Sequence, residues 1–162
     1  MEKKSISFDF EEYFSVEELP EDEKDLLLLA SQVSENAHSP YSDFKVGAAL
    51  KLNNGNVILG VNVENASYGL TICAERTAIG AAVANGLKDQ ISKIAIYGTG
   101  REFNTSEPVT PCGACRQSIK EVEDLSGNSI VLIMSGYKGK ILRVVGIDNL
   151  LPFGFGPKDL AM

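Results

Sequence analysis

The sequence has 162 residues, of which 44% are hydrophobic and 23% charged, so it has enough hydrophobic residues to form the core of one folded domain. The net charge of −7 arises in residues 1–25, where ten acidic residues outnumber three lysines, while residues 26–162 are neutral. Because residues 26–162 carry no net charge, the sequence argues against a nucleic-acid-binding protein and against binding to anionic membranes. The chain also lacks a roughly 20-residue apolar run and a secretory signal, and its odd cysteine count suits a reducing compartment, so a cytoplasmic protein is expected.

Residues 1–20 are expected to form a mobile acidic extension that precedes the domain over residues 21–162. Aromatic side chains alternate with acidic ones in this extension, and the sequence leaves open whether it frays, drapes over the surface or docks on a partner. Apolar residues at three- and four-residue steps predict a helix from residue 21 to about His38, which Pro40 ends.

The remaining elements alternate between strands and helices. Two strands over 44–52 and 57–63 flank the hairpin sequence Asn-Asn-Gly-Asn, which tolerates positive φ. The other predicted elements are a helix over 73–86, a strand over 92–97, a loop over 98–109, a helix to about 125 and strands over 129–134 and 140–145. In the helix that ends at about 125, Thr110 is the expected N-cap residue and Pro111 the first helical position. This order predicts an α/β three-layer sandwich, with a mixed five-stranded sheet flanked by helices.

All three cysteines stand at the starts of predicted helices. Cys73 opens one helix, and Cys112 and Cys115 share the first turn of another. Helix N-termini favour thiolate over thiol, and three thiolates with no fourth cysteine match a catalytic zinc site that leaves one position to water. Three buried thiols are the alternative. A disulfide oxidoreductase would use only Cys112 and Cys115 and would leave Cys73 unexplained. His38, the only histidine, is interpreted as a helix-terminal residue and not as a fourth zinc ligand.

Two charged residues follow Cys73. Arg76 lies one helical turn later, where its charge offsets that of the thiolates. Glu75 is placed either to take a proton from a zinc-activated water or simply to interact with the helix dipole. Position alone leaves these two interpretations of Glu75 open.

The combination Cys73-Ala74-Glu75 with Pro111-Cys112-Gly113-Ala114-Cys115 resembles the zinc-deaminase signature. The wider match is to the cytidine deaminases of the small homotetrameric, three-cysteine type. It covers about residues 26–160 and is carried by four stretches: SPYSDFKVGAAL (39–50), GVNVENASYGLTICAERTAI (60–79), PCGACRQ (111–117) and LLPFGFGP (150–157).

The resemblance implies one Zn²⁺ per subunit, held by Cys73, Cys112 and Cys115, with Glu75 as the proton shuttle. It also implies a set of substrate contacts: Phe44 against the pyrimidine, Asn62 and Glu64 at the ribose, the Ala74 backbone at the base, and Tyr68 and Phe155 from a neighbouring subunit of a homotetramer.

The function implied is hydrolytic deamination of cytidine and 2′-deoxycytidine in pyrimidine salvage. A free nucleoside is the expected small-molecule substrate, because the neutral core offers no cationic stripe for phosphates. Two alternatives stay open: a deaminase of the same fold acting on another aminopyrimidine such as blasticidin S, and a non-catalytic zinc module used for assembly.

Overall fold

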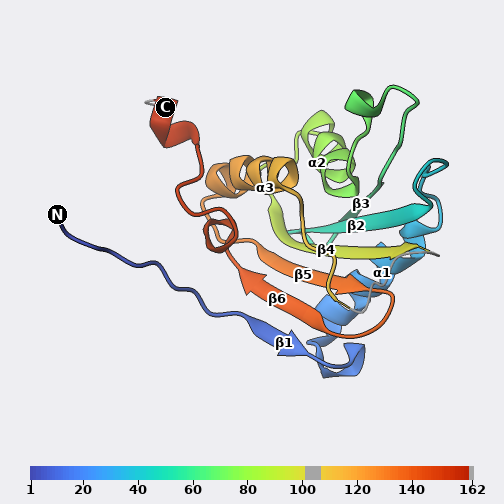
Figure 1. The fold of residues 1–162 in the computed structure, drawn as a ribbon, viewed down its shortest axis with the longest axis horizontal. Coiled ribbons are helices and arrows are strands. Elements are labelled where there is room, and N and C mark those ends of the chain that lie inside the picture. The colour runs from blue at the N-terminus through green and yellow to red at the C-terminus, as the bar shows by residue number, and fades with distance from the viewer. Residues whose placement is uncertain (101–106, 161–162) are drawn as a thin grey trace.

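The computed structural model describes residues 1–100 and 107–160, so residues 101–106 of the predicted loop lie outside the described part. Six strands form one mixed sheet in the order β1-β6-β5-β4-β2-β3 (Figure 1). The strands are β1 (Glu11–Tyr13), β2 (Phe44–Leu52), β3 (Val57–Val61), β4 (Ile91–Gly100), β5 (Val131–Gly136) and β6 (Ile141–Val145). The helices are α1 (Glu21–Ser34), α2 (Ala74–Ala84) and α3 (Gly113–Ser126).

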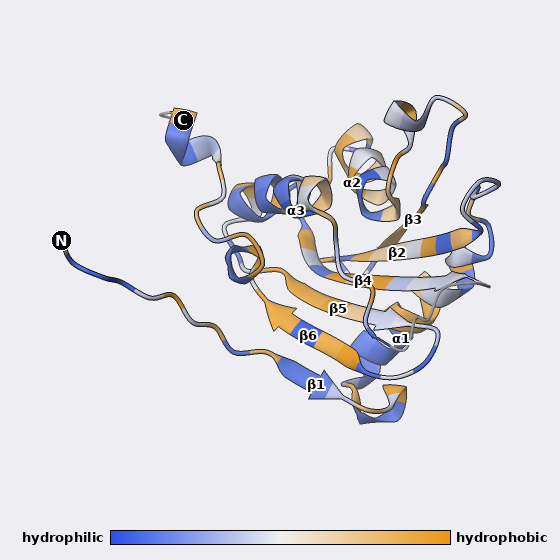
Figure 2. Cartoon of the chain, viewed as in Figure 1, coloured by the Kyte–Doolittle hydropathy of each residue, from blue (hydrophilic) through white to orange (hydrophobic). Residues whose placement is uncertain are grey.

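The three-layer α/β sandwich predicted from the sequence is confirmed. Helix α1 covers one face of the sheet, and α2 and α3 lie together on the other (Figure 1). Each face has its own buried cluster: the α1 side is built around Leu26, Ala30 and Ile133, and the opposite side around Ile94 and Leu132. The apolar colouring of β5 and β6 in Figure 2 marks strands that contribute to both clusters.

The sheet has six strands where the sequence predicted five. The additional strand, β1, comes from the acidic extension and pairs antiparallel with β6, with Glu11 opposite Arg143. The Arg143 guanidinium donates to the Glu11 carboxylate, and Lys140 pairs with Glu12 at 3.1 Å. Because these partners lie more than 120 residues apart in the chain, no local sequence pattern predicts that β1 pairs with β6.

Two helix boundaries differ from the prediction. Helix α1 ends at Ser34, because His38 instead bridges to the sheet: its backbone N–H donates to the Asn62 carbonyl at 3.1 Å. Helix α3 begins at Gly113, so Cys112 rather than Thr110 is its N-cap residue. No helix among residues 1–100 and 107–160 is long and apolar enough to cross a membrane.

The topology brings the starts of α2 and α3 together. Strands β4 and β5 are parallel, so α3 must cross over the sheet between them. Gly60 of β3 lets α2 lie directly on the sheet, since a Cβ at this position would come within 2.5 Å of the Ala74 carbonyl oxygen. Both helices therefore present their N-termini on the same face, next to each other.

Candidate metal and active site

The cysteines occupy the first positions of α2 and α3. Cys73 and Cys112 are the N-cap residues, and neither side chain caps its own helix, so both sulfur atoms remain free for another partner. Cys115 lies in the first turn of α3 and is fully buried. The predicted placement of all three thiols at helix starts is confirmed.

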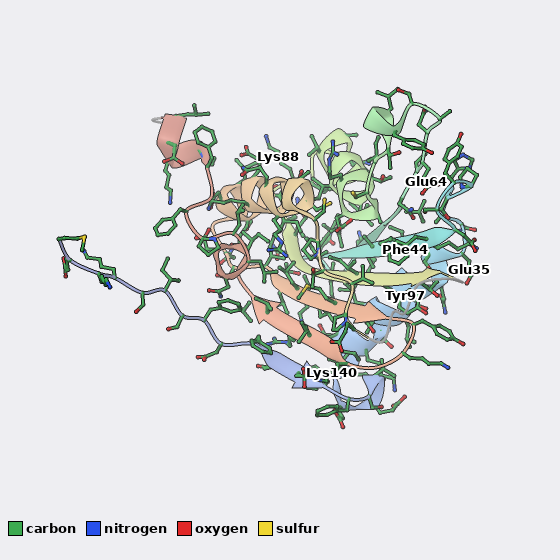
Figure 3. All side chains as sticks on the ribbon, viewed as in Figure 1. Glu35, Phe44, Glu64, Lys88, Tyr97 and Lys140 are labelled. Atoms are coloured by element: carbon green, nitrogen blue, oxygen red, sulfur yellow. The ribbon has the colours of Figure 1, made fainter. Side chains whose placement is uncertain are left out.

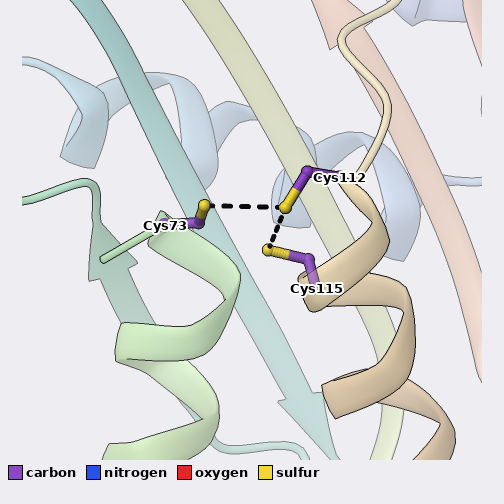
Figure 4. Close-up of side chains that lie close together, drawn as sticks. All are labelled: Cys73, Cys112 and Cys115. Atoms are coloured by element: carbon purple, nitrogen blue, oxygen red, sulfur yellow. Dashed lines mark hydrogen bonds between the residues drawn. The ribbon is translucent and has the colours of Figure 1, made fainter. Parts of the chain in front are cut away.

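The three sulfur atoms converge on one point between the helices (Figure 4). Cys73 Sγ lies 3.8 Å from Cys112 Sγ, which lies 3.5 Å from Cys115 Sγ. Two sulfurs bound to a tetrahedral zinc ion at about 2.3 Å are about 3.8 Å apart, so the observed spacing fits zinc. In the described part of the chain, this trio is the group of His, Cys and acidic residues close enough to share an ion, and His38 is not in it.

Electrostatics favour thiolate at Cys73. Its pKa is lowered to about 6, first because the Cys115 thiol donates to it, then through Cys112 and the positive charge of Arg76. The pKa of Cys115 is raised, because its proton is held by Cys73 and its side chain is buried. Arg76 lowers the pKa of Cys73 from an exposed position.

Glu75 is buried beside the thiols, with 4% of its surface exposed. Burial raises the pKa of its carboxyl group, and the negative charge of Cys73 raises it further. A carboxyl group whose pKa is moved toward neutrality can both accept and return a proton. Its place in the first turn of α2 also puts this carboxyl group at the positive end of the helix, so both interpretations of Glu75 fit its position.

Glu64 and Asn62 lie where β3 continues toward α2, and both are held by the backbone near the start of β2. The Glu64 carboxylate accepts from the backbone N–H groups of Tyr41 and Ser42, at 2.8 and 3.3 Å, and from the Ser42 hydroxyl. These bonds, led by the Ser42 hydroxyl, lower the pKa of Glu64. Asn62 donates to the Phe44 carbonyl at 2.9 Å and accepts from the Val46 N–H at 2.8 Å.

Ser42 is a residue that sequence reasoning missed. Its hydroxyl accepts from the Phe44 N–H at 3.0 Å while donating to Glu64, so one side chain ties two predicted substrate contacts together. Figure 3 shows Phe44 and Glu64 at the same end of the sheet. The signal was present in the stretch SPYSDFKVGAAL, where Ser42 comes two residues before Phe44.

A pocket of about 250 Å³ adjoins these groups, lined by Tyr41, Ser42, Glu64, Tyr68 and Thr71. The Tyr68 ring lies 5.8 Å from that of Tyr41, yet 75% of Tyr68 is exposed. Ala74, by contrast, is fully buried at the first position of α2.

Phe155 does not reach this pocket within one chain. The C-terminal segment lies beside α3, whereas the segment before α2 lies at the far end of the helical layer (Figure 1). More than half of the Phe155 surface is exposed, at 56%. The structure thus brings together the thiols and Glu75, and it brings Phe44 close to Asn62 and Glu64, but it leaves Phe155 apart.

Zinc-dependent deaminases are the class in which a metal bound by thiolates at two helix N-termini works with an adjacent carboxyl group that is not a ligand. The comparisons with known proteins agree. A family model described as "Cytidine and deoxycytidylate deaminase zinc-binding region" matches residues 20–127.

The chain matches similar proteins over nearly the whole length of those proteins. The chain is 42% identical to a cytidine deaminase of Halalkalibacterium halodurans over 139 residues, covering 86% of this chain and 98% of that protein. It is 37% identical to a cytidine deaminase of Sporosarcina psychrophila over 140 residues, covering 86% and 96%.

Solved structures agree with the sequence matches. The crystal structure of cytidine deaminase from Burkholderia pseudomallei superposes with a TM-score of 0.72 at 42% identity, covering 81% of this chain and 97% of that one. That of Mycobacterium tuberculosis gives 0.63 at 30% identity, covering 83% and 98%. The chain therefore belongs to the cytidine and deoxycytidylate deaminase family.

Proposed function

We propose that this chain catalyses the zinc-dependent hydrolytic deamination of cytidine and 2′-deoxycytidine, giving uridine and 2′-deoxyuridine with release of ammonia. The observation that carries the proposal is the meeting of three thiols beside the buried carboxyl group of Glu75. The named relatives support cytidine as the substrate. They favour neither an enzyme for another aminopyrimidine nor a non-catalytic zinc module.

The three cysteines would hold one zinc ion, which when bound would act as a Lewis acid and lower the pKa of a water molecule. The water can then lose a proton and attack the substrate. Glu75 accepts a proton from that water and passes it to the ring nitrogen next to the amine-bearing carbon, which makes this carbon more electrophilic. The water oxygen adds to the carbon and keeps one hydrogen, which Glu75 then takes and delivers to the amino group. The carbon–nitrogen bond breaks to release ammonia, and the added oxygen becomes the carbonyl oxygen of the product. The carboxyl group ends the cycle in its starting protonation state.

We assign the substrate contacts to the groups at the start of β2 and the end of β3. The Glu64 carboxylate, which its backbone and Ser42 bonds fix in place, accepts hydrogen bonds from ribose hydroxyls. Asn62 is assigned to the ribose together with Glu64. Its amide also holds the backbone on both sides of Lys45 and so sets the position of Phe44, whose ring packs on the pyrimidine. The Ala74 backbone, at the positive end of α2, meets the polar edge of the base.

The assembly proposed is a homotetramer in which Tyr68 and Phe155 reach the pocket of a neighbouring subunit. Their exposure, 75% and 56%, supports this, because large aromatics at the surface of one chain commonly mark contacts between chains. We place the enzyme in pyrimidine salvage in the cytoplasm, where a reducing environment keeps the three free thiols available for metal.

The direct test measures ammonia release from cytidine by the purified protein, before and after removal of the metal by a chelator. Activity that disappears with the metal and returns with added zinc supports the proposal. Zinc binding without ammonia release from cytidine would instead favour the assembly module. Release from blasticidin S but not from cytidine would favour the other deaminase.

A further inference from the structure

The C-terminal segment is held against α3 by side chains from two successive turns of that helix. Arg116 Nη1 donates to the Leu150 carbonyl at 2.8 Å, and Gln117 Nε2 donates to the Phe155 carbonyl at 2.8 Å. One turn later, Lys120 lies beneath the same segment. Residues 150–156 therefore run along the helix whose first turn carries two of the cysteines.

Lys120 is a buried charge that the proposed chemistry does not use. Its side chain is 2% exposed, and its Nζ donates to Asp148 at 2.9 Å and to Asp124 at 3.1 Å. Burial alone would lower the pKa of Lys120, but the two carboxylates outweigh it and raise the pKa, so the ammonium stays charged. A buried ammonium is costly unless it is paired, so this ion pair must hold its geometry.

Two glycines fit the tail closely onto this ion pair. A Cβ at Gly154 would come within 2.8 Å of Lys120 Cδ, and one at Gly156 within 2.5 Å of Asp124 Oδ2. Phe155 lies between these two positions, with its backbone fixed by Gln117 and its ring exposed. The packing thus fixes the Phe155 backbone and leaves its side chain available to a partner.

We propose that Lys120 is a positioning residue, which fixes the C-terminal tail so that Phe155 is presented in a defined place to the substrate pocket of a neighbouring subunit. The inference rests on the proposed function, in which Phe155 completes that pocket. Lys120 does not touch the substrate, so its influence on substrate binding passes through Phe155.

The test begins with Lys120→Met, which keeps most of the aliphatic stem and removes the ammonium. We expect KM for cytidine to rise about fivefold or more, because a contact that is no longer preorganised binds less well, while kcat stays within about twofold. The matched control is Lys24→Met, which breaks a surface ion pair with Glu17 far from the tail and should leave both constants unchanged. An unchanged KM in Lys120→Met would overturn the inference.

A double-mutant cycle separates positioning from a general structural effect. Phe155→Ala should raise KM by itself, and adding Lys120→Met to it should change KM no further, because the lysine acts through the missing ring. Independent, multiplying effects would overturn the inference. So would a loss of assembly mass in Lys120→Met by light scattering, since the lysine would then hold the assembly rather than the ring.

Hydrogen exchange supplies a readout apart from activity. Amides of residues 150–156 should exchange faster in Lys120→Met, while those of α2 keep their protection; unchanged exchange in the tail would contradict the inference. If Lys120→Met fails to fold, Gln117→Leu removes the bond to the Phe155 carbonyl from a half-buried position and is carried through the same cycle. A wild-type protein that releases no ammonia would instead refute the proposed function itself.

Discussion

Cys73 Sγ and Cys112 Sγ lie 3.8 Å apart although the two residues begin different helices. The parallel pairing of β4 and β5 and the close approach of α2 at Gly60 bring the two helix N-termini together. Two positive helix ends then stabilise thiolates that would otherwise repel one another. The fold therefore brings together the groups that can share a cation.

Zinc should accordingly protect all of the chain's thiols. We expect one zinc per chain by elemental analysis, and slow reaction of the thiols with a disulfide reagent until a chelator is added, after which three thiols react. Cys112→Ser should lower the zinc content well below one per chain, because a hydroxyl is a poor ligand for zinc. Full zinc content in that variant would place the metal elsewhere.

Glu75→Gln tests the proton shuttle. The amide keeps the size of the side chain but cannot carry a proton between water and substrate, so kcat should fall about 10²- to 10⁴-fold while zinc content stays at one per chain. Elemental analysis and the far-ultraviolet circular dichroism spectrum provide the control for metal and fold. A variant with near wild-type turnover would mean that another group moves the proton.

Glu64→Gln tests the ribose contact. Loss of a hydrogen bond to a charged group costs about 1.5–3 kcal/mol, so KM should rise about 10- to 100-fold with little change in kcat. Glu35→Gln, an exposed carboxylate that pairs with Lys45, is the matched control and should leave KM unchanged. If both substitutions raised KM equally, the assignment of Glu64 to the ribose would be wrong.

The pH dependence of KM follows from the same carboxylate. Hydrogen bonds from Ser42 and from the backbone lower the pKa of Glu64, so the group stays ionised at every pH above its usual titration range. Its contribution to KM should therefore be constant from pH 8 down to about pH 5 and weaken only below the ordinary carboxyl pKa. In Ser42→Ala, which removes the leading hydrogen bond, this weakening should begin at a higher pH.

Glu23 provides a prediction about stability. Its carboxylate is 1% exposed and accepts from Arg143 Nε and Lys93 Nζ, each at 2.8 Å. Burial raises its pKa, but the two cations outweigh burial and lower it. A carboxyl group whose pKa is lowered by folding stabilises the fold at any pH above its unfolded-state pKa. This stabilisation is lost as the pH falls through the folded-state pKa.

Glu23→Gln should thus lower the free energy of unfolding by about 3 kcal/mol at pH 7, because it removes the buried carboxylate that Lys93 and Arg143 share. The two cations then keep only their more exposed partners, Asp22 and Glu11. The difference from wild type should shrink as the pH falls below about 4.5. Urea denaturation at a fixed protein concentration measures it. Glu17→Gln, which breaks an exposed pair with Lys24, should cost less than about 1 kcal/mol at either pH.

Local chemistry explains which parts of the molecule the sequence could predict. The hairpin over residues 53–56 forms as expected, with Gly55 at φ +86°, because its turn depends on adjacent residues alone. The cysteines were placed correctly at helix starts for the same reason. Thr110 was wrongly predicted as an N-cap, because Cys112 still has an extended backbone and α3 begins only at Gly113.

Features that depend on distant partners could not be predicted. Strand β1 has the sequence Glu-Glu-Tyr, without apolar alternation. Its acidic side chains pair with Arg143 on β6 and with Lys140 just before β6. Arg116 joins the Pro111 carbonyl before the cysteines to the Leu150 carbonyl of the tail. Such bonds join segments that only the tertiary fold brings together.

Truncation of the acidic extension distinguishes a free segment from a structural one. Residues 1–10 are exposed throughout, whereas residues 11–13 pair with β6 and Leu19 is 6% exposed in the cluster on the α1 face. Removal of residues 2–10 should leave the unfolding midpoint and the activity unchanged. Removal of residues 2–20 should lower the free energy of unfolding by at least about 2 kcal/mol, because it exposes the Leu19 site and the edge of β6.

Thermal denaturation and ammonia release, measured on both truncated proteins at one concentration, check this expectation. The shorter deletion is the internal control, because it removes equal numbers of acidic and basic residues and no paired strand. If it destabilised the protein as much as the longer deletion, a contact of residues 8–10 with the domain or with a neighbouring subunit would have to be as stabilising as the paired strand. Light scattering would then show whether the lost contact lies between chains, since only in that case would the assembly mass fall.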